Sequence, residues 1–98
     1  MIYDVLVSDE AIFDIAEASF WYGKKKKELA KKFQEEIKQS IEYLSKEPQT
    51  IQKKYKNVHI YFTKTFPFGI HYIMDKKTIK IIAVFHTSIN PKNWTDKI

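Results

Sequence analysis

The chain has 98 residues, of which 44% are hydrophobic and 30% are charged. This length suits a single domain over residues 1–98, and the apolar content is too high for a chain that is disordered throughout. The longest apolar run, residues 81–85, is far shorter than the roughly 20 residues of a membrane-spanning helix. Without cysteine there is no disulfide framework and no thiolate metal site. We therefore expect a single-domain cytoplasmic protein that does not associate with membranes.

The formal net charge is +5, and every basic residue is a lysine. This balance favours an acidic partner, which can be a nucleic acid, an acidic protein segment or an anionic surface. Because there is no arginine to grip a phosphate at two points, any phosphate contact is made by lysine point charges. Four lysines are consecutive at residues 24–27, where a solvated turn is the simplest interpretation.

The first third of the chain predicts a strand and then a helix. Residues 2–7 alternate between two faces, as a strand does. Ser8 is a suitable N-cap for a helix that ends near Tyr22, with Gly23 as its C-cap. The expected apolar stripe consists of Ile12, Ile15, Ala16, Ser19 and Tyr22, widened by Phe13, Phe20 and Trp21. We interpret these aromatic rings as core residues rather than as platforms for stacked bases.

The next helix has the clearest periodicity in the chain. Its apolar residues recur about every fourth position, and Pro48 ends it. They are Leu29, Phe33, Ile37, Ile41 and Leu44. A helix of about 20 residues suits one arm of an antiparallel helical hairpin.

After a polar link over residues 47–54, the period of the apolar residues changes from four to two. Over residues 58–63 we expect Val58, Ile60 and Phe62 to face the helices. His59 and Tyr61 then point away from them. Two further strands, over residues 70–74 and 79–86, are joined by a polar hairpin. In the tail, we expect Trp94 to attach the chain end to the body of the domain.

The order of elements predicts an α+β fold with two layers. An antiparallel helical hairpin covers one face of an antiparallel sheet of about four strands, in the order strand, helix, helix, strand, strand, strand. No helix is left to cover the other face of the sheet. We therefore expect a partner to cover the apolar residues there.

Two motifs in the second half of the chain carry a family resemblance. Phe66-Pro67-Phe68 is followed by Ala83-Val84-Phe85-His86, then by Asn90-Pro91 and Trp94. Upstream, Ala16 and Phe20-Trp21-Tyr22 precede the amphipathic helix that contains Phe33. With the order of elements, this pattern resembles the RelE/ParE superfamily of toxins from bacterial type II toxin–antitoxin modules, nearer its ParE branch.

The resemblance implies a toxin of a plasmid-stabilisation module that a cognate antitoxin neutralises with a flexible acidic segment. A homodimer or a toxin–antitoxin hetero-oligomer is compatible with it. ParE-like members inhibit DNA gyrase, whereas RelE-like members cut mRNA on the ribosome. Members often carry arginines where this chain has His59 and Ile89-Asn90, and RNA cleavage would use such charges. We therefore favour gyrase inhibition through protein binding. The alternatives are a ribosome-dependent ribonuclease and an inactive basic scaffold module.

Six residues are candidates for contact with the target or the antitoxin: His59, Tyr61, Lys64, His86, Asn90 and Trp94. For a ribonuclease, Lys64, His86, His59 and Tyr61 would form the catalytic set. Simpler structural interpretations are also open. Lys64 and the strand face that carries Tyr61 would be solvated, and His86 would form a hydrogen bond to the tail.

We expect neither a metal nor an organic cofactor. In the last hairpin, His71 should lie opposite about Ile82 and His86 opposite about Pro67. About four residues of strand would then separate the two histidines, too far for the imidazoles to meet at one ion. The chain also has no glycine-rich phosphate loop and no nucleophile elbow.

Overall fold

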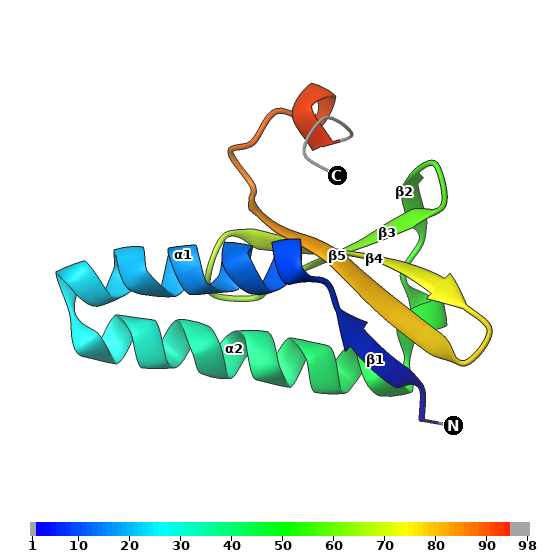
Figure 1. Cartoon of the computed structure of the whole chain (residues 1–98), viewed down its shortest axis with the longest axis horizontal. Helices are drawn as coiled ribbons and strands as arrows, with labels where there is room; N and C mark the ends of the chain where they lie inside the picture. The colour runs from blue at the N-terminus through cyan, green and yellow to red at the C-terminus, as the bar shows by residue number, and fades with distance from the viewer. Residues whose placement is uncertain (1, 95–98) are drawn as a thin grey trace.

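The computed structural model describes residues 2–94, in which a helical hairpin packs on one face of a five-stranded sheet (Figure 1). The elements are β1 (Asp4–Val7), α1 (Asp9–Lys25), α2 (Lys27–Lys46), the 3₁₀ turn η1 (Pro48–Thr50), β2 (Lys53–Tyr55), β3 (Val58–Phe62), β4 (Phe68–Asp75), β5 (Thr78–His86) and the 3₁₀ turn η2 (Pro91–Asn93). Within this range no helix has both the length and the apolar character needed to cross a membrane.

The sheet confirms the α+β architecture but differs from expectation in two respects. Its strand order is β1-β5-β4-β3-β2, and β1 pairs with β5 in parallel, so the sheet is mixed rather than antiparallel. The fifth strand, β2, lies in the segment expected to be a polar link. It pairs with β3 across a tight turn at Lys56, whose φ is +48°. A strand of three residues that begins with two lysines has too little alternation to be predicted.

The start of α1 agrees with the sequence, but its end does not. The Ser8 hydroxyl oxygen accepts a hydrogen bond from the backbone N–H of Ala11 at 3.1 Å, which confirms the N-cap. The helix continues past Gly23 to Lys25 and ends where Lys26 becomes extended. Gly23 is therefore not a C-cap. A Cβ atom there would be 3.5 Å from the Cβ of Ala30, an ordinary van der Waals contact, so packing against α2 does not require a glycine.

The core lies between the hairpin and the sheet. The buried face of α2 carries the predicted residues Phe33, Ile37 and Leu44, and these face Ile70 and Tyr72 of β4 together with Ile79 and Ile81 of β5. The Phe-Pro-Phe motif joins this core, since Phe66 and Phe68 lie 5.6 and 5.0 Å from Phe33 between ring centroids.

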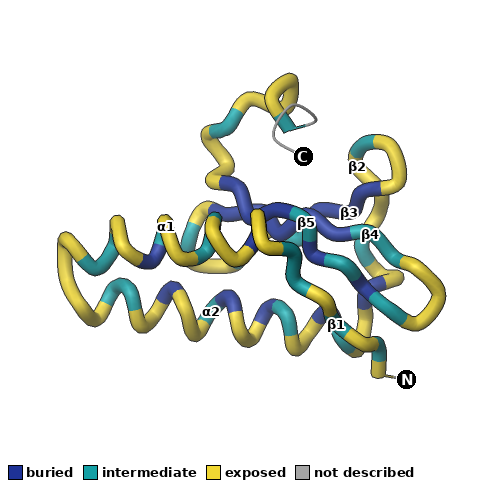
Figure 2. The backbone as a smooth tube through the Cα atoms, in the orientation of Figure 1, coloured by how far each residue is buried: buried dark blue, intermediate teal, exposed yellow. Residues whose placement is uncertain are grey.

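Only a narrow stripe of α1 faces the core. Ala11 is buried, and Ile15, Ala18 and Tyr22 are partly buried against it. Tyr22 is thus an aromatic core residue, as expected. The same expectation is wrong for Phe13, Phe20 and Trp21, whose side chains are exposed, and Figure 2 shows how much of α1 is open to solvent. The physical reason is that α1 packs mainly on α2 and on β5, so its outer flank has no covering layer.

The orientation expected for β3 is wrong. His59 is buried on the helix side, where its Nδ1 lies 2.6 Å from the carbonyl oxygen of Ile51 and its ring stacks on Tyr72. Tyr61 faces α2, with its ring centroid 5.5 Å from that of Tyr43. Alternation separates the two faces of a strand but does not say which face is inside when both are covered.

The opposite face of the sheet is covered by the chain itself. Val58, Ile60, Ala83 and Phe85 are buried there. Trp94 packs on His71 and Tyr55, with centroid distances of 5.0 and 5.2 Å. The contact confirms that Trp94 attaches the tail. It also corrects the expectation that a partner must cover this face, because the tail and β2 do so without a long helix.

Candidate functional site

An open apolar groove runs between the outer flank of α1 and the end of β5, with a volume of about 910 Å³. Phe13 and Trp21 form one wall, and their side chains are 63% and 55% exposed. Ile82 and Phe85 of β5 and Ile89 of the tail line the other side. Large exposed apolar side chains around a concave surface are typical of a binding site.

The floor of the groove contains an unpaired strand edge. β1 pairs only with residues 78–81 of β5, although β5 continues to His86. Beyond Ile81, the start of α1 partly replaces the missing strand. The Ser8 hydroxyl donates to the carbonyl oxygen of Ile82 at 3.3 Å, and the backbone N–H of Val84 donates to the Asp14 carboxylate at 3.0 Å. The Ser8 and Asp14 side chains thus occupy part of this edge, which has no neighbouring strand beyond Ile81.

The rim of the groove is acidic, in contrast to the basic chain as a whole. Asp9, Glu10, Asp14 and Glu17 line it, and no lysine of the described part of the chain does. Asp9 and Glu10, in the first turn of α1, stabilise its positive end, and they also give the groove a negative field. A ligand with a basic or neutral surface fits this site better than an acidic one.

Of the six predicted site residues, His86 lines the groove. Its Nδ1 accepts a hydrogen bond from the backbone N–H of Ser88 at 3.0 Å and lies 2.8 Å from the Ser88 hydroxyl. Its ring meets Phe68 edge-on at 5.2 Å. The predicted hydrogen bond to the tail is thus present, and the same contacts hold the ring at the mouth of the groove.

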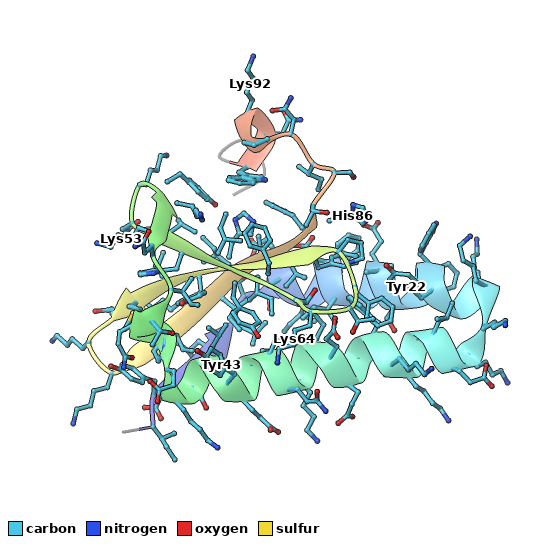
Figure 3. All side chains as sticks on the ribbon, turned by 180° about the vertical axis from the view of Figure 1, so that it is seen from behind. Tyr22, Tyr43, Lys53, Lys64, His86 and Lys92 are labelled. Atoms are coloured by element: carbon cyan, nitrogen blue, oxygen red, sulfur yellow. The ribbon has the colours of Figure 1, made fainter. Side chains whose placement is uncertain are left out.

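The other five predicted residues lie elsewhere, and Figure 3 shows Lys64 near α2, apart from His86. Lys64 is exposed in the β3–β4 loop, which the Glu36 carboxylate holds through the backbone N–H groups of Thr65 and Phe66 at 3.0 and 2.8 Å. The Asn90 side chain accepts from the N–H of Lys92 and caps η2. His59, Tyr61 and Trp94 make the packing contacts described above. The structure therefore does not bring the proposed ribonuclease set together.

The expected strand register is wrong by one residue. His71 pairs with Ala83 and His86 with Phe68, because Ile82 is an extra residue in β5. In residues 2–94 no group of three or more possible ligand residues is placed to hold a metal ion.

His71 lies on the far face and does not line the groove, although its ring is 4.9 Å from that of Phe85, which does. Burial lowers its pKa to about 4, so the ring is neutral at pH 7. Burial raises the pKa of Tyr55 to about 12, and its hydroxyl oxygen lies 2.9 Å from Nδ1 of His71, within hydrogen-bond distance. This pair stabilises the contact between the sheet and the tail.

Sequence reasoning missed the residues that shape the groove. Phe13, Glu17 and Trp21 follow one another at intervals of four, on a helix face beside the buried stripe of Ala11, Ile15, Ala18 and Tyr22. Two aromatic residues outside a complete apolar stripe were a usable indication of a binding surface.

The comparisons with known proteins agree with this architecture. Residues 5–91 match the family model of the ParE toxin of the type II toxin-antitoxin system, parDE. A solved structure of the chromosomal ParDE TA system from P. aeruginosa has a similar fold, with a TM-score of 0.79 and 15% sequence identity over 89% of this chain and 98% of that one. No curated protein matches the sequence. The match to the family model covers most of the chain, and the protein therefore belongs to the ParE toxin family of type II toxin–antitoxin systems.

Proposed function

We propose that this ParE-family protein inhibits DNA gyrase by binding it, and that its cognate antitoxin neutralises it by occupying the α1–β5 groove. The observation that carries the proposal is the open apolar groove itself, with Phe13 and Trp21 exposed above an unpaired stretch of β5. A toxin that is stored in inactive form needs such a surface for a flexible partner segment.

The groove also defines the chemistry of that segment. Apolar side chains of the antitoxin would replace water at Phe13 and Trp21, and its backbone would lie along β5 beyond Ile81. The acidic rim repels carboxylates, so we expect the part of the antitoxin inside the groove to be apolar with neutral or basic neighbours. Acidic residues of the antitoxin, which the family resemblance implies, would lie outside the groove against the lysines.

Gyrase inhibition is favoured over RNA cleavage by the positions of the four residues proposed for catalysis. General acid–base catalysis needs its groups within hydrogen-bond reach of one substrate. His59 and Tyr61 instead pack between the sheet and α2, and His86 lies at the groove. Inhibition through binding needs a complementary surface and no such cluster.

Two assays with the purified chain test the target. We expect loss of gyrase supercoiling activity and no cleavage of mRNA during translation. Cleavage at ribosome-bound codons would establish the ribonuclease instead. Normal growth under strong expression, with neither activity, would indicate an inactive scaffold.

The antitoxin site is tested with two neighbouring residues of α1. Phe13→Glu places a charge in the groove, whereas Ile12→Glu changes an exposed residue that does not line it. We expect Phe13→Glu to weaken binding of the antitoxin from the adjacent reading frame by at least tenfold and Ile12→Glu by less than twofold. Equal effects of the two substitutions would place the antitoxin elsewhere.

A further inference from the structure

The tip of the α1–α2 hairpin projects beyond the sheet and holds the surplus charge of the chain (Figure 1). Residues 20–32 contain six of the seventeen lysines and one of the twelve acidic residues, Glu28. This surplus of five equals the net charge of the whole protein, so basic and acidic residues balance elsewhere. The affinity of the protein for a polyanion is therefore concentrated at one end.

Stability of the hairpin does not explain these lysines. Lys24 and Lys25 lie in the last turn of α1, where cations are favourable. Lys26 and Lys27 begin α2, where cations are unfavourable, and the Lys26 side chain makes no capping hydrogen bond. In residues 2–94 the one ion pair joins Lys80 and Asp75, far from the tip in the fold. Glu28 is the one acidic residue in the first turn of α2, and within the described residues no carboxylate lies within ion-pair distance of these lysines.

Two exposed aromatic rings accompany the lysines. Phe20 is 67% exposed, and the Nζ atom of Lys24 lies 5.1 Å from its ring centroid. Trp21 has the Nζ atom of Lys25 at 4.7 Å from its ring. Cations beside flat rings are the combination with which proteins bind single-stranded nucleic acid, because lysines contact phosphates and the rings stack on unpaired bases.

From this combination we propose that the hairpin tip binds single-stranded nucleic acid, a function that shares Trp21 with the antitoxin groove and is independent of the gyrase proposal. A lipid surface fits less well. Membrane-surface helices insert a continuous apolar face, whereas Leu29 and Ala30 at the tip are turned partly inward and both exposed rings are paired with lysines. Duplex DNA would use the lysines but would leave the rings without bases to stack on.

Fluorescence anisotropy of a labelled twelve-thymidine oligonucleotide with the full chain tests the proposal. If about four lysines contact phosphates, raising salt from 50 to 200 mM should weaken binding roughly 50-fold, from a slope of about −0.7 per contact. Lys26→Glu/Lys27→Glu should weaken binding at least tenfold. Lys53→Glu/Lys54→Glu, the same charge change on β2, should weaken it less than threefold.

The role of the ring is tested separately. Phe20→Ala should weaken oligonucleotide binding about fivefold or more, as expected for one stacked base. The matched control is Phe62→Ala, at an exposed ring on β3, which should have no effect. Circular dichroism melting of each variant establishes that it is folded, and Lys26→Gln/Lys27→Gln replaces the glutamate pair if that one is not.

Four results would overturn the proposal. Equal losses for the two lysine pairs would show attraction by net charge alone. Unchanged binding of Phe20→Ala would remove the stacking contact. Tighter binding of a duplex of equal length would exclude single-strand recognition. Competition by polyglutamate or by phosphatidylglycerol vesicles at equal charge concentration would assign the tip to an acidic protein or a membrane.

Discussion

The two faces of the sheet are both buried, but by very different means. On one face, α2 supplies a continuous row from Phe33 to Leu44, packed against β4 and β5. On the other, Tyr55 and Trp94 cover His71, whose ring packs against Phe85. A face closed by a long helix shares its stability over many side chains, whereas a face closed by two rings depends on each of them. We therefore expect the far face to open first, as a local event.

The largest loss of stability is expected when a core side chain between α2 and the sheet is shortened. Phe33 is fully buried and its ring contacts Tyr22, Phe66 and Phe68. Phe33→Ala should lower the free energy of unfolding by about 3–5 kcal/mol in urea titrations. Phe62→Ala, on the other face and half exposed, is the control and should cost less than about 1 kcal/mol. Similar losses for both would contradict the difference between the faces.

A smaller and more local effect is expected from Trp94→Ala. The ring is partly buried, and its loss would uncover His71 and Tyr55 while leaving the helix side unchanged. We expect a loss of about 2 kcal/mol. Hydrogen exchange should become faster in β2 and β3 but not in α2. Uniformly faster exchange over the whole chain would mean that the two faces form one cooperative unit.

The smallest effect is a dependence of stability on pH. Unfolded His71 binds a proton near pH 6.5, whereas burial lowers its pKa to about 4 in the folded protein. The contribution of neutral, buried His71 to the free energy of unfolding is therefore complete above pH 6.5 and is lost as the pH falls towards 4. Between pH 6.5 and 5.5 the loss is at most about 1 kcal/mol.

Urea titrations at several pH values between 5 and 7 measure this slope. His71→Gln should flatten it, while His86→Gln, at an exposed histidine, should retain it. If His71→Gln keeps the full slope, the proton is taken up elsewhere and the far face is not the acid-sensitive one.

The sequence predicted the parts of the fold in which one strong pattern acts alone. The period of α2, the cap at Ser8 and the attachment of Trp94 each follow from one local rule, and the structure agrees. The facing of β3 could not be predicted, because both of its faces are covered and its more apolar face, with Val58, Ile60 and Phe62, lies away from the helices. The C-terminus of α1 was missed because Gly23 lies inside the helix, which continues to Lys25, and does not form a turn.

The candidate site was predicted less well than the fold. Six residues were chosen from the strands and the tail, and His86 is the one of them that lines the groove. The groove itself depends on how α1 lies over the free part of β5, which is a tertiary arrangement that helix periodicity does not contain. Family resemblance indicated the role of the protein, and the geometry was needed to place the surface.

The two tryptophans lie in different surroundings, which gives the protein two built-in optical reporters. The Trp21 side chain forms part of the groove wall and is largely exposed to water. Trp94 instead packs against the neutral imidazole of His71 on the far face of the sheet. Replacing either indole with phenylalanine would leave a single emitter. Spectral shifts and acrylamide quenching could then follow occupation of the groove and detachment of the tail as two separate events in one molecule.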